Sequence, residues 1–166
     1  QKAEIKVLKK NIKNQQQVTR KPEYSQEELY TDNHGLGDTY IEVNLTEQHL
    51  YYYKKGKVVL DTPFVSGRMT KDRFTPPGVY FLTYKQKDRI LRGRPNASGQ
   101  PSYQSHVNYW MPFNGGVGIH DLASRGNNFG GDIYKTNGSH GCINTPLEAA
   151  KTIYETVSVG TPVIVY

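Results

Sequence analysis

Two short stretches, Gly118-Ile119-His120-Asp121 and Ser139-His140-Gly141-Cys142-Ile143-Asn144, contain two of the five histidines and the only cysteine of this chain. A thiol becomes an effective nucleophile when a neighbouring imidazole or a helix N-terminus lowers its pKa from ~8.5. His140 precedes Cys142 by two residues, and His120 can approach from an adjacent strand. The pattern therefore predicts a cysteine nucleophile assisted by histidine.

The glycine before the cysteine favours a tight turn at the reacting group. Gly141 has no Cβ, so the backbone can approach closely there. An oxyanion site needs backbone donors aimed at a developing negative charge. The N–H groups of Gly141 and Cys142 are therefore candidates for part of such a site.

The segment after this turn carries the signals of one helix. Thr145-Pro146-Leu147-Glu148 matches a capping box with proline at the first helical position. An apolar stripe follows at Leu147, Ala150, Tyr154 and Val157. Gly160 then ends the element. The partial positive charge at the start of this helix would favour a thiolate at Cys142 if the helix axis points at the sulfur.

The rest of the chain from Asp38 onward has a mainly β pattern. Apolar and polar residues alternate as in half-buried strands, and turn residues separate the segments. The predicted strands are Tyr40–Leu45, His49–Lys54, Lys57–Phe64, Val79–Tyr84, Val107–Pro112, Val117–His120 and Pro162–Tyr166. Lys55-Gly56 predicts a hairpin turn. The polar stretch Asp88–Ser105 predicts a long surface excursion, which is typical of lids and binding loops.

Composition limits the class of protein. The 166 residues include 21 Lys+Arg and 15 Asp+Glu, for a net charge of +6, and the 13 tyrosines help to build one core despite only 36% hydrophobic residues. No apolar run is long enough to span a bilayer, so no membrane contact is expected of this chain. A single cysteine excludes an internal disulfide and a Cys-rich zinc finger. Nucleic acid is not an expected partner, because no aromatic-plus-basic recognition motif accompanies the charge.

The N-terminal segment, residues 1–37, differs from the remainder. Six basic residues and no acidic one lie between Ile5 and Lys21, and Ile5, Leu8 and Ile12 have the spacing of a short amphipathic helix. Such a segment cannot bury a core alone. We therefore predict a basic linker or the remnant of a preceding domain over residues 1–37, and one domain over residues 38–166.

Residue types alone leave alternatives open. A lone cysteine is more often a small buried hydrophobe than a nucleophile. Three zinc ligands with an open position could also come from His120, Asp121, His140 and Cys142. The aromatic run at Tyr109 and Trp110 fits core packing as well as it fits the border of a substrate groove.

The two histidine segments resemble the signature of the L,D-transpeptidase catalytic domain, or YkuD domain. Thr75-Pro76-Pro77-Gly78-Val79-Tyr80 is similar to the strand entry of that family, and Ser66-Gly67 to the turn before it. The closing Gly160-Thr161-Pro162-Val163-Ile164-Val165 also fits. The resemblance covers about residues 38–166 and is strongest to enzymes of Gram-positive enterococci.

This resemblance implies a mixed β-sandwich or barrel-like domain, mainly β, with one main helix after the catalytic cysteine. It also implies an acyltransferase that needs no cofactor and no metal. Such an enzyme releases D-Ala from a peptidoglycan stem tetrapeptide and passes the acyl group to an acceptor amine, which forms a cross-link starting at residue 3. Covalent inhibition by carbapenems and a part in β-lactam resistance follow from the same resemblance. We expect a monomer that acts outside the cytoplasm, at the cell wall, and that is anchored in the membrane upstream of Gln1.

The resemblance also assigns roles to single residues. Cys142 would be the nucleophile and His120 the general acid/base, oriented by the main-chain carbonyl of Asp121. His140 would support the thiolate, while Ser139 and Gly141 would shape the turn. The predicted substrate-side residues are Asn144, Tyr109, Trp110 and Asp121. The excursion Asp88–Ser105 would form a hairpin lid, whose Arg89, Arg92 and Arg94 are candidates to meet stem-peptide carboxylates. A zinc-dependent wall hydrolase and an inactive wall-binding module remain as alternatives.

Overall fold

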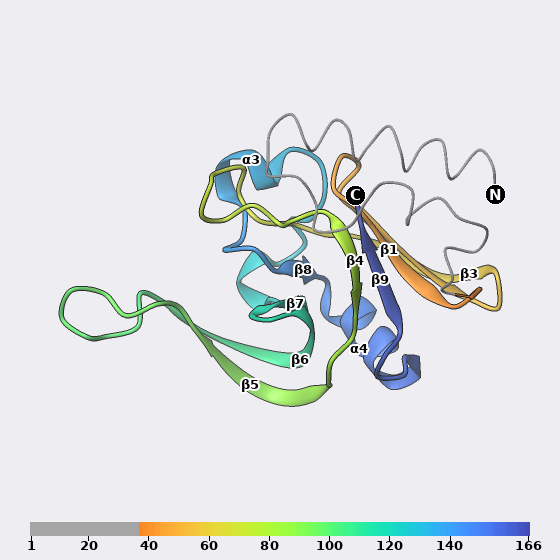
Figure 1. Ribbon diagram of the computed structural model, residues 1–166. Helices are drawn as coiled ribbons and strands as arrows, with labels where there is room; N and C mark the ends of the chain where they lie inside the picture. Colours follow the sequence, from red (N-terminus) through yellow and green to blue (C-terminus); the bar gives the residue numbers. More distant parts are fainter. Residues whose placement is uncertain (1–36) are drawn as a thin grey trace.

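Two β-sheets organise the part of the chain that the computed structural model describes, residues 37–166 (Figure 1). The five-stranded sheet has the order β3-β2-β1-β9-β4 and the four-stranded sheet the order β5-β6-β7-β8. The strands of the first sheet are β1 (Tyr40–Asn44), β2 (His49–Lys54), β3 (Lys57–Pro63), β4 (Gly78–Phe81) and β9 (Pro162–Val165). Those of the second are β5 (Gln86–Arg92), β6 (Gln104–Asn114), β7 (Val117–Asp121) and β8 (Ile143–Thr145). The helices are η2 (Ala123–Arg125), α3 (Ile133–Asn137) and α4 (Leu147–Thr156).

The five-stranded sheet follows from the alternating pattern of its strands. Ile41 and Val43 are fully buried on one face of β1, as the alternation predicts. Lys55 and Gly56 join β2 and β3 with positive φ angles of 52° and 78°, which matches the tight turn that twisted antiparallel strands prefer. The last strand, β9, pairs parallel to β1, so the two ends of the domain meet in the middle of the sheet.

The core lies where α4 packs against β3, β6 and β7. Its fully buried side chains include Leu50, Phe64, Met111, Ile119 and Ile153. Burying one side chain of this size contributes roughly 1.5–3 kcal/mol relative to leaving it exposed. Ile119 therefore anchors β7, the strand that carries His120, to the hydrophobic interior.

The mainly β fold class, with few helices, is confirmed, but several elements differ from the prediction. Helix α4 is present, yet the capping box is wrong, because the N-cap is Pro146 and no side chain caps the helix. Thr145 is instead fully buried in β8, where it pairs with Asp121 of β7. The buried face of α4 is formed by Ala149, Ala150 and Ile153, while Leu147 is 47% exposed.

The stretch 88–105, predicted as a long surface excursion from its composition and as a hairpin from the resemblance, forms most of a β-hairpin. Strands β5 and β6 pair antiparallel from Gln86↔Trp110 to Arg92↔Gln104, and the hairpin projects from the rest of the domain (Figure 1). Most side chains of β5 are exposed, so its sequence lacks the apolar alternation of a half-buried strand. Strand β8 and the helices η2 and α3 were not predicted.

Some expectations concern residues outside the described range. The short amphipathic helix around Ile5–Ile12 falls there, and the division into a linker and one domain stays a prediction. Within residues 37–166, no helix has the length and apolar character that crossing a bilayer requires.

Candidate active site

The two histidine segments meet because β7 and β8 lie side by side. The two strands are parallel, with His120 opposite Asn144 and Asp121 opposite Thr145. The chain between them forms η2 and α3, and its residues reach the same cavity. A parallel pair needs such a crossover connection. The segment between the two motifs therefore forms one wall of the site.

His120 is buried and held at both ring nitrogens. Its Nδ1 lies 2.7 Å from the main-chain oxygen of Asp121 and its Nε2 lies 3.2 Å from Nδ2 of Asn144. A carbonyl oxygen only accepts, so Nδ1 carries the proton and Nε2 offers the lone pair. Burial lowers the pKa of His120, with Asp121 opposing and Arg125 adding to the shift. The imidazole is therefore neutral and available as a base at pH 7.

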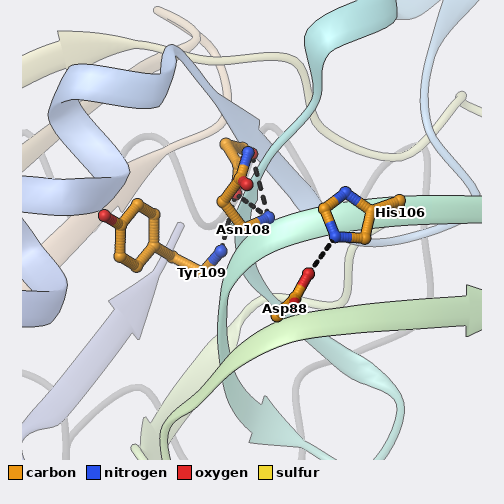
Figure 2. A network of polar contacts seen from close by, with 5 residues as sticks. Asp88, His106, Asn108 and Tyr109 are labelled. Atoms are coloured by element: carbon orange, nitrogen blue, oxygen red, sulfur yellow. Dashed lines mark hydrogen bonds and ion pairs between the residues drawn. The ribbon is translucent and has the colours of Figure 1, made fainter.

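The carboxylate of Asp121 fixes the end of β7 from the other side. It accepts hydrogen bonds from the backbone N–H groups of Asn108 at 2.9 Å and Tyr109 at 2.8 Å, and from Nδ2 of Asn108 at 2.8 Å. Figure 2 shows Asn108 and Tyr109 on β6, with the His106–Asp88 pair further along the hairpin. The main-chain carbonyl that orients His120 is thereby tied to the base of the hairpin.

The turn before Cys142 is closed by Ser139. Its Oγ donates to the carbonyl oxygen of Cys142 at 2.6 Å and accepts from the N–H of Gly141 at 3.1 Å. Gly141 has φ +132°, where side chains are disfavoured. Ser139 therefore holds the turn as expected, but the Gly141 N–H is already engaged. In the resting site this N–H is therefore not open to an oxyanion, and the part of Gly141 in an oxyanion site stays a prediction.

The thiol of Cys142 is held against the start of β7. It donates to the carbonyl oxygen of Gly116 at 3.3 Å, and the N–H of Gly118 donates to the sulfur. Burial of the sulfur raises the pKa of the Cys142 thiol from 9.0 to about 11, and the Gly118 N–H only partly opposes this. The expected lowering of the thiol pKa is wrong. Strand β8 separates the cysteine from α4, so that helix does not begin beside the sulfur.

His140 differs from His120 in its surroundings. It is exposed, and its ring stacks on Tyr103 with 4.1 Å between the ring centroids. Partial burial, followed by the charge of Arg73, lowers the pKa of His140. Tyr103 lies between β5 and β6, and a Cβ on Gly93 would lie 2.4 Å from its ring. The hairpin therefore reaches the site through this stacked pair.

A cavity of about 580 Å³ collects these groups. His120, Ser139, His140, Cys142 and Asn144 all line it. Tyr109, Trp110 and Asp121 do not. The Tyr109 ring packs against Tyr154, and the Trp110 Nε1 donates to the hydroxyl of Tyr84 at 3.1 Å. The prediction that these three residues border the substrate receives no support from the cavity lining.

Arg125 lines the cavity and was not predicted. Its Nε donates to Oδ1 of Asn144 at 2.9 Å and its Nη1 to the carbonyl oxygen of Asn137 at 2.9 Å. The three hairpin arginines that were predicted to meet carboxylates, Arg89, Arg92 and Arg94, do not line the cavity. The sequence did hold a signal for Arg125: it lies between the two motifs, and the segment that connects two parallel strands forms a wall of the site.

The alternative of a zinc site has no geometric basis in the described chain. Within residues 37–166, no group of three or more His, Cys, Asp or Glu side chains lies close enough together to hold a metal ion. His120 and Cys142 each face other partners, namely the carbonyls of Asp121 and Gly116.

Comparisons with known proteins agree with this geometry. The family model of the YkuD L,D-transpeptidase catalytic domain matches residues 38–165. A crystal structure of a cysteine-to-serine mutant of Enterococcus faecium L,D-transpeptidase is 49% identical with a TM-score of 0.71, covering 79% of this chain and 50% of that one. The NMR structure of the catalytic domain of the E. faecium enzyme acylated by ertapenem is 51% identical with a TM-score of 0.66, covering 78% and 98%.

A more distant structure, an L,D-transpeptidase from Mycobacterium smegmatis, is 25% identical with a TM-score of 0.65, covering 78% of this chain and 58% of that one. The chain thus spans about half the length of the E. faecium crystal structure that it matches. No curated protein sequence matches the chain. Since the family model covers nearly all of the described residues, the chain belongs to the YkuD family of L,D-transpeptidase catalytic domains.

Proposed function

We propose that this chain is a peptidoglycan L,D-transpeptidase in which Cys142 is the nucleophile and His120 the general acid/base. One observation carries the proposal: the Cys142 thiol and the His120 imidazole line one cavity. The main-chain carbonyl of Asp121 accepts from Nδ1 of that imidazole, so Nε2 is the unprotonated nitrogen. A base held in one tautomer by a third group is the arrangement that activates a weak nucleophile.

The first half-reaction begins with a neutral pair. Because the pKa of Cys142 is raised and that of His120 is lowered, the thiol keeps its proton until attack. The thiol turns from the Gly116 carbonyl to Nε2 of His120, and Asn144 gives up that nitrogen. Sulfur then bonds to the carbonyl carbon between residue 3 and D-Ala of a stem tetrapeptide while Nε2 takes the proton. The C–N bond breaks, and the imidazolium returns the proton to the amine of the departing D-Ala.

The second half-reaction reverses these proton movements. An acceptor amine attacks the thioester carbon, and His120 takes a proton from the attacking nitrogen. The C–S bond breaks, the sulfur leaves as a thiolate, and the imidazolium reprotonates it. The product is an amide that links residue 3 of the donor to the acceptor amine, and the enzyme returns to its starting state.

Two backbone N–H groups near Cys142 can stabilise negative charge during the reaction, one on the sulfur and one on the carbonyl oxygen of the substrate. The N–H of Gly118 donates to the sulfur and stabilises the thiolate that leaves in the second half-reaction. The Gly141 N–H becomes a donor only if Ser139 releases it. Each oxyanion donor in an acyl-transfer site is worth about 100- to 1,000-fold in rate, so this turn is a candidate for rearrangement on substrate binding.

His140 has a different role in this proposal. Its ring stacks on Tyr103 of the hairpin and forms part of the cavity wall, where it shapes the site and supports the loop that bears Cys142. The thiol proton goes to His120, which is the histidine held in a defined tautomer.

Inhibitors and location follow from the same proposal. The E. faecium catalytic domain is acylated by ertapenem, and we infer that carbapenems acylate Cys142 of this chain. Peptidoglycan lies outside the cytoplasm, so the domain acts there. Membrane anchoring upstream of Gln1 and a monomeric state remain predictions. The charge of +6 suits an anionic wall polymer.

Two measurements test the proposed function. Incubation with a synthetic stem tetrapeptide and an acceptor amine is expected to release D-Ala and to form a cross-linked dimer. Intact-mass measurement after incubation with a carbapenem is expected to show one covalent adduct in the wild type and none in Cys142→Ala. A wild-type protein that does neither would remove the proposal, and stoichiometric zinc with peptide hydrolysis would favour the wall hydrolase.

A further inference from the structure

Arg125 carries a charge that nothing in the described structure neutralises. The guanidinium is half-buried in the cavity wall, and no Asp or Glu among residues 37–166 forms an ion pair with it. Its two hydrogen bonds go to neutral oxygens of Asn144 and Asn137. Of the five N–H donors of a guanidinium, three remain for a ligand. A partly desolvated cation with spare donors gains most from a carboxylate, which it can bind through two parallel hydrogen bonds.

The position of Arg125 relative to His120 indicates which carboxylate this is. One side-chain amide, that of Asn144, bridges Nε of Arg125 at 2.9 Å and Nε2 of His120 at 3.2 Å. With an amide between them, the two nitrogens are within about 8 Å of each other. The guanidinium of Arg125 therefore lies close enough to Nε2 of His120 for one small ligand to contact both.

The departing D-Ala carries both an amine and a carboxylate, so it can contact both side chains. In the proposed reaction, Nε2 of His120 must come within hydrogen-bond distance of the amine of the departing D-Ala. The carboxylate carbon of that D-Ala lies only two covalent bonds, about 2.5 Å, from the same amine. A cation within about 8 Å of Nε2 can therefore hold this carboxylate while the amine receives its proton. The hairpin arginines Arg92 and Arg94 do not line the cavity.

We propose that Arg125 binds the terminal carboxylate of the donor tetrapeptide and so selects donors that end in a free D-Ala. This inference rests on the proposed function and adds the residue that recognises the leaving group. Because Asn144 contacts both side chains, a carboxylate on Arg125 also acts on the group that occupies Nε2 of His120 in the resting site. Recognition of the donor end and exposure of the base then occur at the same place.

The test compares two donors in each protein variant. One donor is a synthetic tetrapeptide with a C-terminal D-Ala carboxylate, and the other is the same peptide ending in the carboxamide. We expect the wild type to prefer the carboxylate in kcat/KM by about 10- to 100-fold, the usual range for hydrogen bonds to charged groups. Arg125→Gln should lose most of that preference, and Arg125→Lys should keep part of it. Taking the ratio within one variant cancels any general loss of activity or stability.

The matched control is Arg92→Gln, which removes the same charge from the hairpin outside the cavity and should leave the ratio unchanged. An Arg125→Gln protein that still prefers the carboxylate as strongly as the wild type would overturn the inference, and so would a wild type without any preference. In both cases the carbapenem adduct and D-Ala release leave the proposed function standing. A wild type that uses neither donor and forms no adduct would overturn both.

Discussion

His120 and His140 line the same cavity, but one is held inside a sheet and the other lies on an exposed turn. His120 is 5% exposed and has a partner at each ring nitrogen, supplied by Asp121 and Asn144. His140 is exposed, and its defined contact is the stack on Tyr103. A base must hold one tautomer and one orientation, whereas a wall residue needs only shape. Burial and hydrogen bonding, not closeness to the cysteine in sequence, are what separate the two proposed roles.

The largest effect is expected from removing the buried histidine. His120→Ala should lower the rate of acylation by a carbapenem at neutral pH by about 100- to 10,000-fold, because general acid–base catalysis typically contributes that much. The rate of adduct growth by mass spectrometry measures it. Thermal unfolding shows whether the variant stays folded. An acylation rate close to that of the wild type would give the role of base to another group.

The pH dependence sharpens the same comparison. Burial lowers the pKa of His120 below its usual 6.5, so acylation should be constant from neutral pH down to about 6.5 and then fall towards tenfold per pH unit once the pH is below the lowered pKa. In the unfolded chain the histidine binds a proton at its usual pKa. Folding stability should therefore be complete above pH 6.5 and decrease below it.

His120→Gln is the control for that profile. Its free energy of unfolding should lack the part of the decrease below pH 6.5 that protonation of His120 causes in the wild type. At the alkaline end, the acylation rate should change again only near pH 11, where the raised pKa of Cys142 lies. An acid limb above pH 6.5 would contradict the assignment of a buried, neutral base.

A smaller effect is expected from the group behind the buried histidine. Asp121→Asn replaces a buried carboxylate that accepts from the N–H groups of Asn108 and Tyr109, and its amide would turn a donor towards one of them. We expect a loss of about 1–3 kcal/mol in the free energy of unfolding. The charge of Asp121 raises the pKa of His120, so its removal should move the acid limb to lower pH. Denaturant unfolding and the acylation profile measure the two effects, and an acid limb at higher pH would be inconsistent with them.

The smallest effect is expected at the exposed histidine. His140→Phe keeps an aromatic ring for the stack on Tyr103 and should retain acylation within a few-fold of the wild type, while His140→Ala should slow it by up to about tenfold. Stopped-flow or mass-based acylation rates distinguish them. If both variants lose as much activity as His120→Ala, the two histidines act as one coupled unit and the comparison fails.

The strands of the five-stranded sheet were predictable because their signals are local. The alternation around Ile41 and Val43 and the turn at Lys55-Gly56 depend on neighbours in the chain. The β5–β6 hairpin was expected only from the resemblance, because its exposed strand β5 carries no apolar alternation that composition could reveal. Its existence depends on pairing such as Arg89↔Val107, which only the folded backbone defines. The capping box failed for a related reason, since pairing of Thr145 with Asp121 outweighed a local preference.

The sequence by itself indicated the family, which the family model confirms, because the two histidine segments and their order along the chain resemble its signature. It also predicted Cys142 and His120 as the reacting groups, and that assignment stays a proposal. It also indicated the carbonyl of Asp121 as the partner of His120, a contact that the structure contains. Only the tertiary structure decided the protonation states, the engagement of the Gly141 N–H and the place of Arg125 in the cavity wall. These depend on burial and on hydrogen bonds between segments far apart in the chain, and neither is encoded in the local pattern.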